Sequence, residues 1–137
     1  MAQHHESSCA GAPHVWYPRC RPALLWPVLH ELEVCARCGL GRHTERWGGT
    51  SRVRFVAPQD QLSPTHYRVD LRTRADFGDS LTAIQGCPGV LQSYGSESTP
   101  TEASIYFEVQ DFYAPAFEAS VSRLPCVRGY APVSREW

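Results

Sequence analysis

The chain has 137 residues, a formal net charge of −1, 42% hydrophobic and 20% charged residues. This composition is typical of a globular protein and excludes an intrinsically disordered one. No apolar run is long enough to span a bilayer, and the first residues lack the basic and apolar segments of a secretory signal. We therefore expect a cytoplasmic protein with no membrane partner, in a reducing setting where paired cysteines favour metal over disulfides.

The charge is unevenly distributed along the chain. Residues 1–58 carry a net charge of +3 and residues 59–137 a net charge of −4. All thirteen basic residues are arginine, a bias that a very GC-rich genome explains and that selection against lysine modification would also produce. The asymmetry permits a basic N-terminal part that contacts an anionic partner, but its magnitude is too small to require a nucleic acid.

The first segment of the chain shows no regular periodicity. Residues 1–13 are polar and are expected to form a loose end. Residues 14–27 read HVWYPRCRPALLWP, and the three prolines of this stretch prevent a long helix. We interpret this stretch as an irregular arm whose aromatic side chains pack on the rest of the protein.

A Cys-x-x-Cys-Gly turn follows the arm. Residues 28–34, VLHELEV, alternate apolar and polar side chains as a strand does, and residues 51–56, SRVRFV, alternate again. Between them lies Cys35-Ala-Arg-Cys38-Gly39, in which two thiolates reach one metal ion and the glycine permits a tight fold. Strand, turn, loop and returning strand predict a zinc-stapled β-hairpin module, similar to a zinc ribbon, over residues 1–58.

The cysteine pair supplies two of the four ligands that a structural zinc ion needs. We expect Cys9 and His14 to complete the site, because they form a Cys-x4-His pattern ahead of Cys35 and Cys38. The rival candidates for the second pair are Cys20, His30 and His43. Free thiols or a redox pair are the alternative interpretation of the turn, but Gly39 and Gly41 disfavour the helix that a thioredoxin-type pair precedes.

Five arginines lie in or near this module and are the predicted partner-binding residues. They are Arg37, Arg42, Arg46, Arg52 and Arg54. Through them the module could dock on a protein or on a nucleic acid.

The remainder, residues 59–137, alternates strands and helices after a proline-containing linker. The pattern predicts strands over residues 66–74, 90–97, 103–110 and 127–133, and helices over residues 76–85 and 114–124. This βαββαβ order is that of a ferredoxin-like plait, with both helices on one face of an antiparallel sheet. The fold class of the whole chain is therefore α+β.

Two resemblances to known families follow from these motifs. Arg74-Ala-Asp-Phe-Gly78-Asp-Ser-Leu81, with Gly89-Val90 and Leu124-Pro-Cys-Val127, resembles the ACT and Lrp-type effector-binding domains. That resemblance implies a dimer that binds a small ligand at the loop containing Gly78. The Cys9-x4-His14 and Cys35-x-x-Cys38-Gly39 pattern is similar to small zinc modules of phages of GC-rich hosts; it implies a metal and no activity.

Two functions follow as hypotheses. The first is a non-enzymatic, zinc-containing binding, adaptor or regulatory protein, which the similarity to phage zinc modules suggests is phage-encoded. Such a protein would dock a protein or nucleic-acid partner, or form a homodimer through its sheet or helices. The alternative is a small plait-type enzyme that acts through Cys87, Cys126 or His66, the thiols and the histidine of the C-terminal part. We find no phosphate-binding loop, dinucleotide fingerprint or Ser-His-Asp signature in the sequence.

Overall fold

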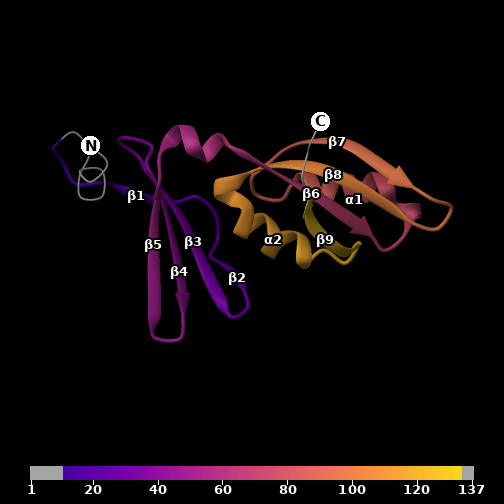
Figure 1. The fold of residues 1–137 in the computed structure, drawn as a ribbon, viewed down its shortest axis with the longest axis horizontal. Coiled ribbons are helices and arrows are strands. Elements are labelled where there is room, and N and C mark those ends of the chain that lie inside the picture. Colours follow the sequence, from indigo (N-terminus) through magenta and orange to yellow (C-terminus); the bar gives the residue numbers. More distant parts are fainter. Residues whose placement is uncertain (1–10, 134–137) are drawn as a thin grey trace.

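The computed structural model describes residues 11–133, which form an α+β fold with two antiparallel sheets and two α-helices. The two sheets lie at opposite ends of an elongated molecule, the N-terminal sheet in indigo to magenta and the C-terminal one in magenta to yellow (Figure 1). Cys9 lies outside the described residues.

The N-terminal sheet has five strands in the described part of the chain. They are β1 (Trp16–Pro18), β2 (Ala23–Leu25), β3 (Val28–Cys35), β4 (Gly41–Trp47) and β5 (Thr50–Val56). β4 pairs with β3 on one side and β5 on the other, while β1 and β2 both pair with the far edge of β3.

This sheet is more extensive than the sequence indicates. The arm contributes two short strands, and the segment expected to be a loop is β4, so that β5 pairs with β4 instead of β3. The sequence of β4, GRHTERW, contains no aliphatic side chain, and for this reason hydropathy does not reveal it. Its buried positions are instead Gly41, His43 and Thr44.

A 3₁₀ turn over Pro58–Leu62 leads into the C-terminal part. Its strands are β6 (Pro64–Leu71), β7 (Val90–Ser98), β8 (Ala103–Gln110) and β9 (Val127–Val133). Its helices are α1 (Phe77–Gln85) and α2 (Ala114–Ser122). A 3₁₀ turn precedes each helix, over Arg74–Asp76 and Asp111–Tyr113. The strands pair antiparallel in the order β7-β8-β6-β9. Each predicted element of this part is present, with bounds that differ by a few residues at most.

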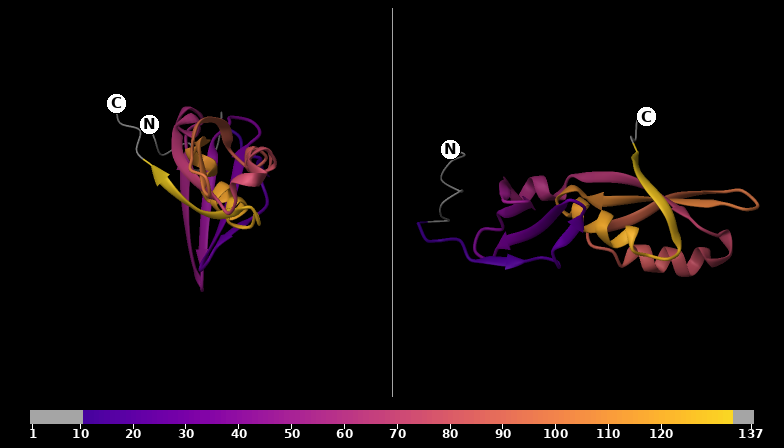
Figure 2. Two further views of the ribbon diagram at one scale, coloured as in Figure 1. Left: turned by 90° about the vertical axis from the view of Figure 1, so that its right-hand side faces the viewer. Right: turned by 90° about the horizontal axis from the view of Figure 1, so that it is seen from below.

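The main core lies between this sheet and the two helices. In β6 and β8, buried and half-buried residues alternate, which places Val69 and Phe107 on the covered face. Ile84 of α1 and Phe117 of α2 pack into the same cluster, so both helices cover one face of the sheet (Figure 2). Burying this apolar face supplies most of the stability that such a small sheet requires.

A second apolar cluster joins the two sheets. Ala23 and Leu32 of the N-terminal sheet pack with Phe112 of the 3₁₀ turn before α2 and with Ala116 and Ala119 of α2. Figure 1 shows α2 at this junction, beside β2 and β3. The face of the N-terminal sheet that carries Leu32 is therefore covered by the C-terminal part.

Candidate metal centre

The Cys-x-x-Cys-Gly turn connects β3 to β4 and is closed by its own backbone. The N–H of Gly39 donates to the carbonyl oxygen of Cys35 at 2.9 Å, and the N–H of Cys35 donates to the carbonyl oxygen of Leu40 at 2.9 Å. Gly39 has a φ of +78°, a left-handed conformation that other residues adopt only at a cost. The turn thus holds both cysteines on a rigid hairpin.

The backbone of the turn also activates Cys35. The side chain is buried, which alone raises the pKa of its thiol, but hydrogen bonds to the sulfur from backbone N–H groups of Cys38, Val15 and Arg37 and from His14 lower the pKa to about 5. The Arg37 N–H lies 3.4 Å from the sulfur. These hydrogen bonds favour the thiolate of Cys35, the form that binds metal ions.

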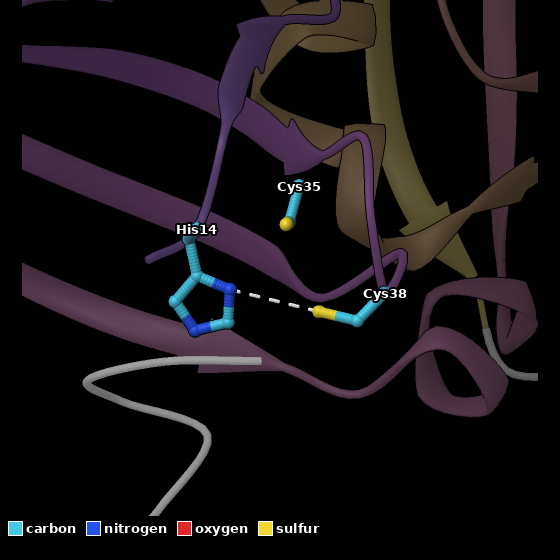
Figure 3. A group of neighbouring side chains, drawn as sticks. All are labelled: His14, Cys35 and Cys38. Atoms are coloured by element: carbon cyan, nitrogen blue, oxygen red, sulfur yellow. Dashed lines mark hydrogen bonds between the residues drawn. The ribbon is translucent and has the colours of Figure 1, made fainter. Parts of the chain in front are cut away.

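His14 completes a group of three metal-ligand side chains. Its Nδ1 atom lies 3.6 Å from Cys38 Sγ, and Cys35 Sγ points into the same space (Figure 3). One ligand atom from each of His14, Cys35 and Cys38 lies within 4.8 Å of the others. Ligand atoms of a tetrahedral zinc site are about 3.4–3.8 Å apart, so small side-chain movements would bring these three around one ion.

Neighbouring contacts hold His14 in place. The N–H of Ala36 donates to the carbonyl oxygen of Val15 at 2.8 Å, which ties the arm to the turn. The His14 ring lies against the Trp16 ring, with ring centroids 4.9 Å apart. The guanidinium of Arg42 also packs on Trp16, 4.2 Å from the centre of its ring. The aromatic arm is thus packed along the sheet next to the metal ligands.

The rival ligands lie elsewhere. Cys20 packs with the apolar cluster at the junction, and burial raises the pKa of its thiol. His30 and His43 face each other, with Nδ1 of His30 2.8 Å from Nε2 of His43, and form a group with Glu45 that does not include the cysteines. Of the residues that the sequence singled out as ligands, the structure brings together His14, Cys35 and Cys38.

The five arginines do not form one basic surface. Strand register places Arg42 and Arg46 on one face of the N-terminal sheet and Arg52 and Arg54 on the other, while Arg37 is exposed in the turn. Three of them are ion-paired, Arg42 to Glu33 at 2.9 Å, Arg46 to Glu31 at 2.6 Å and Arg52 to Glu45 at 2.5 Å. These pairs reduce the positive potential available to an anionic partner.

The candidate nucleophiles of the C-terminal part lie in a different environment. Cys87 is buried, and burial together with the nearby Cys126 raises the pKa of its thiol to about 11. His66 lies on β6 with its ring edge-on to Tyr94, at a centroid distance of 5.4 Å. A thiol with a raised pKa is a poor nucleophile at neutral pH.

Comparison of the chain with models of protein families, with curated proteins and with solved structures gave no match. Within residues 11–133, none of the helices has the length and apolar character needed to cross a membrane. The functional inference therefore rests on the site itself.

Proposed function

We propose that this protein is a non-enzymatic, zinc-containing binding protein whose N-terminal sheet is held by one zinc ion. The observation that carries the proposal is the convergence of His14, Cys35 and Cys38 around the turn between β3 and β4. Two sulfur ligands and one nitrogen ligand are a donor set typical of structural zinc, and Cys9 is the fourth ligand that the sequence predicts. Bound there, the ion would fasten the aromatic arm to the hairpin.

The C-terminal part would serve as the rigid body of such a protein. We infer a ferredoxin-like plait, resembling ACT and Lrp-type domains, for residues 59–137. The strand order β7-β8-β6-β9 and the two helices on one face support this inference, because they are the arrangement of a split βαββαβ unit. The raised pKa of Cys87 favours a binding role over the thiol-enzyme alternative.

We propose a protein rather than a nucleic acid as the partner. Trp26, at the tip of the β2–β3 hairpin, is 86% exposed, and Trp47, at the tip of the β4–β5 hairpin, is also exposed. The pairing of the strands puts both tips at the same end of the sheet. Exposed tryptophans are enriched at the centres of protein interfaces, whereas most of the arginines here are already paired with carboxylates.

The metal is tested on the purified full-length protein. Elemental analysis should find zinc, and Cys38→Ser should reduce the zinc content and shift the tryptophan emission, because Trp16 packs on His14. The matched control is Cys126→Ser, which removes a thiol far from the turn and should leave both readouts unchanged. A zinc content that is the same in the wild type and in Cys38→Ser, together with a tryptophan emission that ignores a chelator, would refute the proposal.

The partner is tested by photo-crosslinking in the native source. A benzophenone amino acid at position 26 should give a covalent adduct of defined mass, and the same probe at position 91, an exposed leucine on β7, should not. Fluorescence anisotropy with a labelled DNA duplex and a labelled RNA strand provides the second arm. Tight, salt-dependent binding to either nucleic acid, with no adduct at position 26, would overturn the choice of a protein partner.

A further inference from the structure

A second cluster of ligand-type side chains lies along the β3–β4 hairpin, apart from the cysteine turn. His30 and His43 are only 8% and 6% exposed, and their Nδ1 and Nε2 atoms lie 2.8 Å apart. The Oε2 atom of Glu45 lies 3.9 Å from His30 Nδ1. Buried polar side chains need partners. Two imidazoles and a carboxylate that converge on one point can satisfy each other through a hydrogen bond or by binding the same ion.

The strands place these three side chains by register alone. His30 is opposite Glu45, and Leu32 is opposite His43, in adjacent antiparallel pairs of β3 and β4. All of them project from the face that Leu32 buries against α2. The cluster is therefore built on two paired strands and is partly covered by the C-terminal part, which is the rigid setting that a binding site requires.

The distances suit a small divalent ion. Around a tetrahedral ion with zinc–nitrogen bonds of about 2.0–2.1 Å, neighbouring ligand atoms are about 3.3 Å apart. The two histidine nitrogens would have to separate by about half an ångström, and the carboxylate oxygen would have to approach by a similar amount. Both changes are within reach of side-chain rotation, with the backbone of the strands unchanged.

The surroundings of Glu45 also fit a ligand role. Arg52 donates two hydrogen bonds to Oε1 of Glu45, at 2.9 Å from Nε and 2.5 Å from Nη2, while Oε2 faces the histidines. Ligating carboxylates are commonly oriented by such a second partner. Glu118 of α2 lies near enough to His30 to act on it electrostatically and adds negative charge that favours a cation.

One contact opposes the ion in the present arrangement. The Arg54 NH2 group lies 3.4 Å from Nδ1 of His43, so that a donor faces the nitrogen that would carry a proton when Nε2 binds a metal. Arg54 is exposed and can turn toward solvent. Removal of the Arg54 guanidinium should therefore strengthen metal binding.

We propose that His30, His43 and Glu45 form a second site, separate from the cysteine turn, for Zn²⁺ or a similar divalent transition-metal ion. Two imidazoles and one carboxylate suit zinc, cobalt and nickel ions and do not suit calcium or magnesium, which prefer oxygen ligands alone. His43 and Glu45 also line a pocket together with Arg52, Val53 and Arg54, through which water or a small anionic ligand would reach a bound ion. The site does not depend on whether the cysteine turn binds zinc.

The experiment is a zinc titration of the full-length protein with two readouts. Equilibrium dialysis should show one more zinc ion per chain in the wild type than in His43→Gln, while His66→Gln, a histidine on the other sheet, should bind as much as the wild type. Long-range ¹H–¹⁵N spectra of the histidine rings should show Nδ1 of His30 and Nε2 of His43 shifting to metal-bound values in the wild-type protein. This second readout needs no variant and holds even if His43→Gln fails to fold.

Two further variants should change the zinc affinity of this site in opposite directions. Arg54→Gln replaces a donor near His43 Nδ1 with a group that can accept, and it should tighten zinc binding at this site several-fold. Arg52→Gln removes the partner of Glu45 and should weaken it about tenfold. Ring nitrogens of His30 and His43 that keep their metal-free shifts in excess zinc would overturn the proposal, whatever the cysteine turn binds.

Discussion

Gly41 of β4 is in contact with the ring of Phe112 across the junction of the two sheets. A Cβ atom on Gly41 would lie 2.8 Å from Cε1 of Phe112 and 2.9 Å from Nε2 of Gln61. The amide of Gln61 in turn donates to the carbonyl oxygens of Gly39 and Val56, at 2.8 and 3.1 Å. The absence of a side chain at position 41 therefore allows the N-terminal sheet to lie directly against the C-terminal part.

The first prediction is that Gly41→Ala destabilises the whole protein. The added methyl group must displace an aromatic ring that is 1% exposed and an amide that closes the loop, and overpacking of this kind costs about 1–3 kcal/mol. Urea denaturation followed by far-UV circular dichroism measures the change. Gly78→Ala is the matched control, since a Cβ there meets open space at the start of α1, and it should leave stability equal or slightly raised.

The double variant Gly41→Ala with Phe112→Leu separates the contact from other effects. The smaller side chain makes room for the methyl group, so the loss in the double variant should be less than the sum of the two single losses. Additive losses would show that the two residues are not in contact.

The C-terminal part is predictable from sequence because its two central strands, β6 and β8, carry a strong local signal. In β8, alternate residues are buried, and this alternation appears directly in the hydropathy of ASIYFEVQ. β4 has no such signal, since its inward-facing positions are Gly41, His43 and Glu45. Gly41 lies against Phe112 of the C-terminal part, and His43 lies against His30 of β3; the local sequence of β4 does not encode either contact.

The same difference applies to the candidate metal ligands. The grouping of Cys35 and Cys38 follows from their spacing within one tight turn, which the sequence displays. The pairing of His30 with His43 depends on the register between β3 and β4, which a sequence pattern that predicts a loop after the cysteine turn does not contain. For this reason the sequence alone presents both histidines only as alternative ligands for the zinc site at Cys35 and Cys38.

The second prediction concerns the main core. Phe107 is fully buried at the centre of the cluster formed by the C-terminal sheet and both helices, so Phe107→Ala should lower the free energy of unfolding by about 3–5 kcal/mol. Phe55→Ala on β5 is the comparison, because Phe55 is only partly buried beside Trp16 and should cost less. An unchanged urea midpoint for Phe107→Ala would show that the register of β8 is wrong.

The third prediction is that residues 59–137 fold alone but less stably than in the full chain. The cluster around Phe107 comes entirely from this part, so cooperative unfolding should persist. Removal of Ala23 and Leu32 would uncover Phe112 and the small residues of α2, and the fragment should therefore associate at high protein concentration. Sedimentation measures this association, and Phe112→Gln in the fragment should reduce it; a fragment without a cooperative transition would contradict the prediction.

The last prediction concerns the reactivity of the two thiols at the helix-to-strand corners. Because burial and the neighbouring Cys126 raise the pKa of Cys87 to about 11, very little of its side chain is expected to be a thiolate at pH 8. Iodoacetamide reacts with thiolates, so the native protein at pH 8 should be alkylated at Cys126, which is more exposed than Cys87, well before it is alkylated at Cys87. The rate at Cys87 should rise about tenfold for each pH unit between pH 7 and 9, since this range lies entirely below its pKa. Peptide mass spectrometry of timed samples gives both rates, and the protein unfolded in urea provides the reference at which the two cysteines react alike. Rapid, pH-independent alkylation of Cys87 in the native protein would contradict this environment and would favour the thiol-enzyme alternative over a binding role.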